Sequence, residues 1–128
     1  MDRRKIIDAL GLVPGGGLSV IDMQMEQWGR NLIFACLYRV TPFNTAPDEP
    51  VHFSLVFRDC REIKYRVYAH IGEHEQGQVT SIADIAEISL GRGHHNRDAN
   101  ILTNHFSISV SYGEVAAETE DAIYILSD

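Results

Sequence analysis

Two adjacent histidines, His94 and His95, lie in the polar segment GRGHHNRDAN at residues 91–100. Imidazole nitrogens bind haem iron and transition metals, and a carboxylate such as that of Asp98 can orient the ring. In an extended segment adjacent side chains point to opposite sides, so the two rings are poorly arranged to bind one metal ion together. The segment therefore predicts either a single axial ligand for a haem-like group or a solvated loop.

A second pair, His70 and His74, has a spacing that brings two imidazoles onto one face only in a helix. Gly72 and the strand-like pattern before it argue against a helix here. Ile71 also occupies the position where a catalytic zinc motif needs glutamate. We therefore predict a loop at this place and no metal site.

A third candidate is the alternating run HFSISVSY at residues 105–112. One face of this strand pattern carries one imidazole and three small hydroxyls, those of His105, Ser107, Ser109 and Ser111. Solvent-facing strands usually carry long charged side chains, whereas small polar ones leave room for a ligand if the sheet curls around them. The alternative is that the opposite, apolar face fills the core and the serines meet water or another subunit.

Evidence for catalysis is limited to residue types. The sequence has no G-x-S-x-G motif, and a Ser-His-Asp triad cannot be inferred without geometry. Cys60 lies in an expected turn beside Arg61, where a structural thiol is the simpler interpretation. We expect no enzymatic activity, with a His and carboxylate site built around His105 or His94 as the remaining alternative.

Length and composition fit one β-rich domain over residues 1–128, because the chain is 45% hydrophobic and long enough for a core. Its two cysteines are typical of a reducing compartment, although a disulfide between them stays open. No signal peptide or membrane span is recognisable, so a cytoplasmic protein without membrane contact is expected. The net charge of -7 is concentrated after residue 70 and argues against nucleic-acid binding.

The elements that must position these groups follow from the hydrophobic periodicity. Residues 1–11 predict a helix that Asp2 caps and Gly11 ends, and residues 12–17 predict a Gly/Pro linker. Antiparallel strands are expected over residues 18–126, including a hairpin in which two strands flank Asp59, Cys60 and Arg61. Residues 79–90 fit a helix or a strand, and we favour a strand over 84–90.

Together these patterns predict a mainly β protein, with about seven antiparallel strands forming a barrel or a sandwich. The N-terminal helix is expected to pack over one opening or edge of it.

The stretches FRDCREIKY and ILTNHFSISVSYGE resemble segments of small uncharacterised bacterial β-rich proteins. Some of these proteins are provisionally described as haem-binding on structural similarity alone. The resemblance covers roughly residues 51–113, and its motifs are strand patterns without chemistry of their own. It implies a haem-like cofactor without assigning the iron ligand to His94, His95 or His105.

Three functions remain open on the sequence. The first is a non-enzymatic binding module for a small hydrophobic or tetrapyrrole ligand, with one histidine as an axial ligand and a cavity lined by the three serines. The second is a protein-interaction or homodimerisation domain that uses a strand edge or Trp28, Phe43 and Tyr68 as contacts. The third is the enzyme with a His and carboxylate site.

Overall fold

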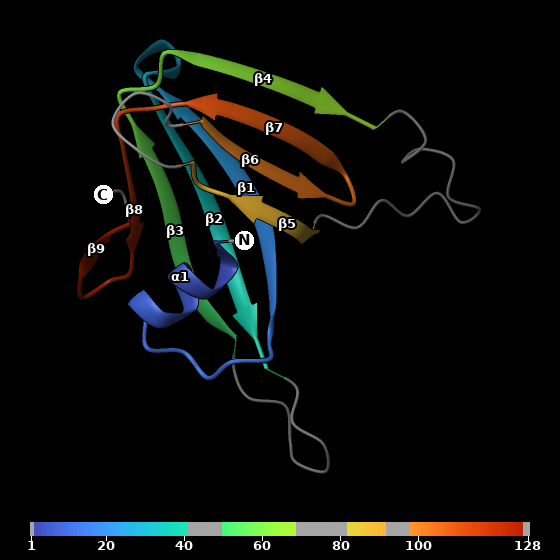
Figure 1. Ribbon diagram of the computed structural model, residues 1–128, viewed down its shortest axis with the longest axis vertical. Helices are drawn as coiled ribbons and strands as arrows, with labels where there is room; N and C mark the ends of the chain where they lie inside the picture. The colour runs from blue at the N-terminus through green and yellow to red at the C-terminus, as the bar shows by residue number, and fades with distance from the viewer. Residues whose placement is uncertain (1, 41–49, 69–81, 92–97, 127–128) are drawn as a thin grey trace.

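The computed structural model describes residues 2–40, 50–68, 82–91 and 98–126, and all statements below concern these residues (Figure 1). They form one short helix and nine strands. The elements are α1 (Arg3–Ala9), β1 (Gly17–Glu26), the 3-10 turn η1 (Gln27–Gly29), β2 (Asn31–Arg39), β3 (Val51–Arg58), β4 (Glu62–Val67), β5 (Ala83–Ser89), β6 (Asp98–Thr103), β7 (Phe106–Ser111), β8 (Glu114–Glu118) and β9 (Ile123–Ile125). No helix among these residues is long and apolar enough to cross a membrane.

All nine strands belong to one antiparallel sheet in the order β4-β7-β6-β5-β1-β2-β3-β8-β9. The sheet is not closed into a barrel, since β4 and β9 lie at its two ends. The mainly β, antiparallel prediction is confirmed, but the prediction of about seven strands is wrong. The two additional strands are β6, which begins inside the polar segment 91–100, and the short strand β8.

The sheet bends so that its two parts face each other across the core. β1 pairs with β2 along its whole length but with β5 at only two positions, Ser19↔Asp84 and Val20↔Ala83. Its register with β2 shifts between Val20 and Asp22, and such a bulge bends a strand and increases its twist. The apolar faces of β2 and β3 therefore lie opposite that of β7.

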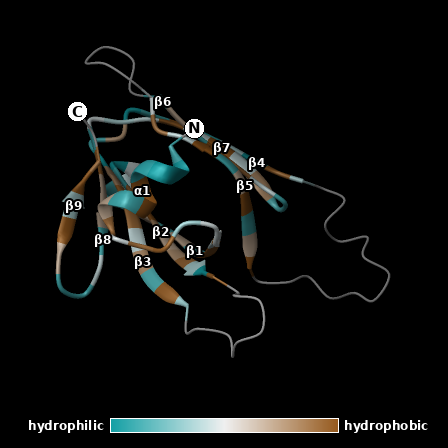
Figure 2. Cartoon of the chain, turned by 60° about the horizontal axis from the view of Figure 1, so that its bottom comes forward, coloured by the Kyte–Doolittle hydropathy of each residue, from teal (hydrophilic) through white to brown (hydrophobic). Residues whose placement is uncertain are grey.

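Aromatic contacts join the two parts. The ring of Phe34 on β2 stacks on that of Phe106 on β7, with centroids 6.4 Å apart. The ring of Phe57 on β3 meets that of Tyr112 edge-on at 5.1 Å. Hydrophobic and hydrophilic residues alternate in the first half of β3 (Figure 2), and Phe53, Leu55 and Phe57 are buried, as expected of a strand with one face in the core.

The predicted hairpin between β3 and β4 is wrong. β3 pairs with β2 and β8, whereas β4 pairs with β7 in the other part of the sheet. The backbone of the connection explains this: Asp59 has a φ of 56°, the N–H of Cys60 donates to Arg30 O, and that of Arg61 donates to Ser111 O. The connection thus carries the chain from one part of the sheet to the other.

The N-terminal helix is shorter than predicted and is fixed differently. Gly11 adopts the left-handed conformation expected after a helix end, with a φ of 66°. Asp2, however, makes no side-chain cap of the helix. Its carboxylate accepts a hydrogen bond from Leu90 N–H at 2.6 Å and its own N–H donates to Ile88 O at 3.1 Å, so Asp2 attaches the helix beside β5. The strand expected near 84–90 is confirmed as β5.

Both cysteines are free thiols, and burial raises the pKa of the Cys36 thiol from 9.0 to about 12. The folded protein therefore keeps this proton where the unfolded chain has lost it, so the free energy of unfolding should fall between pH 9.0 and about 12. Urea unfolding at about pH 8 and about pH 10.5 measures this loss. Cys36→Ala should show a smaller loss than the wild type, because tyrosines and lysines titrate equally in both; an identical loss would contradict the prediction.

Candidate functional site

The predicted ligands of the histidine loop lie outside the described residues. This holds for His94 and His95 and also for His70 and His74. A haem ligand at residue 94 or 95 thus stays a prediction. Among the residues that the structure describes, no group of three or more His, Cys, Asp or Glu side chains could hold a metal ion.

His105 is held by hydrogen bonds of the scaffold. Its ring Nε2 lies 3.1 Å from the carbonyl oxygen of Ile82, its backbone N–H donates to Thr103 Oγ1, and its carbonyl accepts from Tyr68 N–H. The ring Nδ1 is buried. Because Nε2 would have to leave Ile82 to bind iron, this geometry favours a structural role for His105 at the start of β7.

The three serines lie on the face of β7 that points away from the core. Ser109 Oγ donates to Asn100 Oδ1 at 2.6 Å, and Ser111 Oγ donates to Asp98 Oδ1 at 2.6 Å. Ser107 lies between Arg66 of β4 and Leu102 of β6 in the register. The core side of the strand is filled by its apolar residues. As ligand-binding residues the serines stay a prediction, placed on the outer surface of the sheet.

The clearest hollow in the described structure is an open groove of about 600 Å³ on the outer face of β1, β2 and β3, bounded by the residues that end β8. Its floor is apolar and consists mainly of Ile33 and Ala35 from β2 and Val56 from β3. Val56 is only 6% exposed although it lies on the outer face. The volume of the groove lies within the range of about 300–1,000 Å³ that is usual for ligand sites.

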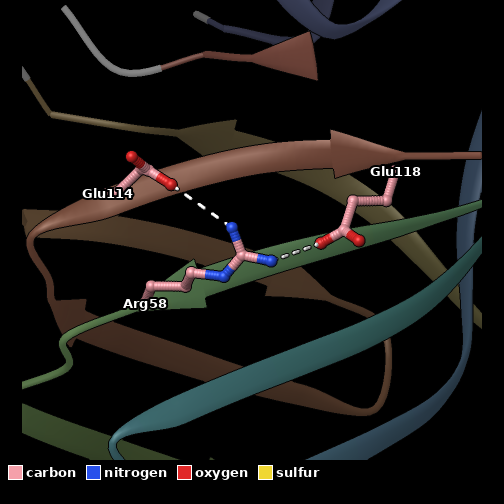
Figure 3. A network of polar contacts seen from close by, with 3 residues as sticks. All are labelled: Arg58, Glu114 and Glu118. Carbon is pink, nitrogen blue, oxygen red and sulfur yellow. Dashed lines mark hydrogen bonds and ion pairs between the residues drawn. The ribbon is translucent and has the colours of Figure 1, made fainter. Parts of the chain in front are cut away.

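One end of the groove is ordered by an ion-pair network between β3 and β8 (Figure 3). The Arg58 guanidinium lies between two carboxylates, 3.1 Å from Glu118 and 3.4 Å from Glu114. The β3–β8 register places Glu114 directly opposite Arg58. Because both carboxylates are only partly exposed, they compensate the positive charge of Arg58 within the protein.

The rest of the rim is polar, and its two carboxylates belong to Glu26 and Glu120. Glu26 and Glu120 line the groove beyond the network, and His52 and Ser54 precede Val56 on the same face of β3. With Glu118, the lining holds three carboxylates and one guanidinium. This combination of an apolar floor and excess negative charge suits a ligand that has an apolar body and a positive charge.

A second depression, of about 450 Å³, lies between α1 and β5. Its charged lining residues are balanced in sign, because Arg3 and Arg4 accompany Asp8 and Glu87. Arg4 also lies 3.9 Å from Asp8 on the same helix. Such a surface does not favour a ligand of either charge, so we take the groove as the better candidate for a ligand site.

Part of the signal for the groove was present in the sequence. The run NLIFACLYRV is apolar on both faces, which predicts a strand covered on both sides. In the structure its outer face is only half-buried and forms the floor of the groove. Arg58, Glu114 and Glu118 were not candidates, because their proximity depends on the pairing of two strands distant in the sequence.

No protein-family model, no curated protein sequence and no solved structure matches the chain.

Proposed function

We propose that this protein is a non-enzymatic binding module whose outer-face groove holds an organic cation with an apolar body. The observation that carries the proposal is the pairing of an apolar floor with an acidic rim in one hollow of about 600 Å³. The ligand remains in the small hydrophobic class expected from the sequence, but its charge is specified by the rim.

The floor supplies the affinity. Removing apolar surface from water contributes about 25 cal/mol per Å², and the floor of Ile33, Ala35 and Val56 is already a firm, partly buried surface. A ligand of suitable width would cover these side chains without requiring the sheet to open. This argument favours an aliphatic or aromatic body over a strongly hydrated one.

The rim supplies the selectivity. The Arg58 charge is compensated by Glu114 and Glu118 in the protein, so Glu26 and Glu120 leave net negative charge around the groove. An ammonium group placed there is attracted, whereas a sulfate or carboxylate is repelled. The net charge of -7 on the whole chain acts in the same direction at longer range.

A pair of matched probes tests the proposal. Octyltrimethylammonium and octyl sulfate have the same alkyl chain and opposite charges, and both are titrated below their micelle concentrations into labelled protein. We expect the cation to shift the amide resonances of Ile33 and Val56 saturably and the anion to leave them unchanged. Equal binding of the two probes, or no saturable shift with the cation, would overturn the proposal.

Charge variants locate the site. The double variant Glu26→Lys/Glu120→Lys should weaken binding of the cation by about tenfold or more, corresponding to about 1.4 kcal/mol. The single variants Glu26→Lys and Glu87→Lys make the same charge change inside and outside the groove and are compared directly. Glu26→Lys should weaken binding, whereas the affinity of Glu87→Lys should stay within about twofold of the wild type, since long-range charges are screened by salt. A similar loss in the control would show that net charge alone determines binding.

A further inference from the structure

A different surface, the free edge of β4, has the pattern of an interface. β4 is the last strand of the sheet, and among the described strands it pairs only with β7 (Figure 1). On the other side of β4, no strand of the described residues pairs with its backbone. The N–H of Tyr68 donates to His105 O, and hydrogen-bonded pairs alternate along an antiparallel ladder. Ile63, Tyr65 and Val67 therefore direct their N–H and C=O groups to the free edge.

The apolar face of β4 continues the core of the sheet, but its side chains are unusually exposed. Ile63, Tyr65 and Val67 are in register with the core residues of β7, yet Tyr65 is 46% and Val67 58% exposed. The ring of Tyr65 lies 5.5 Å from that of Phe106, so it extends the aromatic core to the edge. An apolar layer that ends uncovered at an open strand edge is typical of a site for strand addition.

The charged face of β4 selects a partner and a register. It carries Glu62, Lys64 and Arg66, so an antiparallel neighbour with the same sequence can place opposite charges opposite each other. The apolar side chains of both copies must also lie on the same face of the joined sheet. The two-fold axis must therefore pass through a residue of β4 and not between two residues. The choice is then between centres at Ile63, Lys64 and Tyr65.

The three positions of the two-fold axis differ in the charge pairs that they create and in the number of residues that pair. A centre at Tyr65 sets Lys64 against Arg66 of the second copy, which is repulsive. A centre at Ile63 pairs Glu62 with Lys64 but leaves only the first half of β4 in the ladder. A centre at Lys64 uses residues 62–66, sets Glu62 against Arg66 twice and Ile63 against Tyr65 twice. The two central lysines then face each other, and each already lies 3.3 Å from Glu62 of its own chain.

We propose that two copies of this chain pair antiparallel along β4, with Glu62 opposite Arg66 and Ile63 opposite Tyr65 of the second copy. About four backbone hydrogen bonds join the strands, because Ile63 and Tyr65 form the hydrogen-bonded pairs. The sheets of the two copies become continuous, and the side chains of Ile63 and Tyr65 from both copies lie next to the two-fold axis.

Trp28 provides a reporter at this interface. It is the single tryptophan of the chain, it is fully exposed, and its neighbour Gly29 approaches Ile63 Cδ1. In the proposed dimer Ile63 faces Tyr65 of the second copy, so the turn that holds Trp28 and Gly29 lies near the contact. Its emission is expected to shift to shorter wavelength as the protein concentration rises.

Charge reversal tests the register. Sedimentation velocity should give a dimer for the wild type, and the single variants Glu62→Arg and Arg66→Glu should each be monomeric, because each places like charges opposite each other twice. An equimolar mixture of the two variants should recover the dimer, since every such pair is then complementary. The double variant Glu62→Arg/Arg66→Glu should dimerise alone.

Other results would overturn the proposal. They are a monomeric wild type at the highest soluble concentration, a dimer that neither single variant affects, and a mixture that stays monomeric. If Glu62→Lys/Lys64→Glu forms a dimer and Glu62→Arg/Arg66→Glu does not, the two-fold axis lies at Ile63 and not at Lys64. All substituted side chains are exposed, and circular dichroism of each variant controls for unfolding.

Discussion

Val110→Asp is expected to prevent the protein from folding. Val110 is 1% exposed on β7 and lies between Ile63 of β4 and Ala99 of β6, so a carboxylate there has no water and no cationic neighbour in the register. Burying such a group costs several kcal/mol, which is comparable to the total stability of about 5–15 kcal/mol of a typical domain. Far-ultraviolet circular dichroism and urea unfolding measure the outcome.

Ser107→Asp is the matched control for this substitution. Ser107 lies on the same strand but on its outer face, opposite Arg66. The new carboxylate stays in contact with water and faces a guanidinium, so the free energy of unfolding should change by less than about 1 kcal/mol. If Val110→Asp unfolds cooperatively at a normal urea concentration, or if the control is the more damaging change, the two faces of β7 are assigned incorrectly.

The two faces of β7 are also where the sequence was most informative. Residues 105–112 alternate without interruption, and period-two alternation determines which side chains enter the core. β6 and β8 were harder to predict for the same physical reason. The segment DANILT is short and follows a polar stretch of sequence, and EVAAE has only three apolar residues, two of them alanines, between glutamates. Neither segment presents a long alternating run.

The connection between β3 and β4 shows a second limit. Two alternating runs separated by three residues are compatible with a hairpin, and nothing local distinguishes a hairpin from a crossing to another part of the sheet. The crossing depends on distant hydrogen-bond acceptors, Arg30 O for Cys60 and Ser111 O for Arg61. The groove could not be predicted for the same reason, because Arg58 contacts Glu114 and Glu118 only through the pairing of β3 with β8.

The candidate sites differ in what the sequence could reveal. Alternation along residues 62–67 accounts for the exposed charges of β4, and Trp28 was predicted as a contact of an interaction domain. Their combination into an edge surface required the sheet order. The unusual composition of the serine face was recognised, but Asn100 and Asp98 of a strand that was not predicted explain much of it.

Phe34→Ala is expected to cause a large loss of stability without a buried charge. Phe34 is completely buried, contacts Phe57 edge-on with centroids 6.0 Å apart and stacks on Phe106 across the core. Removing a buried phenylalanine ring costs about 3–5 kcal/mol, because apolar burial is lost and a cavity is left. Urea unfolding gives the difference, and a loss below about 1 kcal/mol would contradict this packing.

Substitutions of Phe34 also show how the two parts of the sheet associate. Strand pairing between the two parts of the sheet comprises two register pairs between β1 and β5, so side-chain contacts such as Phe34 with Phe106 must provide much of their association. Phe34→Leu retains most of the apolar volume and removes only the ring contacts, and it should lose less than Phe34→Ala. A double-mutant cycle with Phe106→Leu should give a coupling of about 0.5–1.5 kcal/mol. A coupling near zero would mean that the two parts associate through β1 and β5 and the remaining core rather than through this pair.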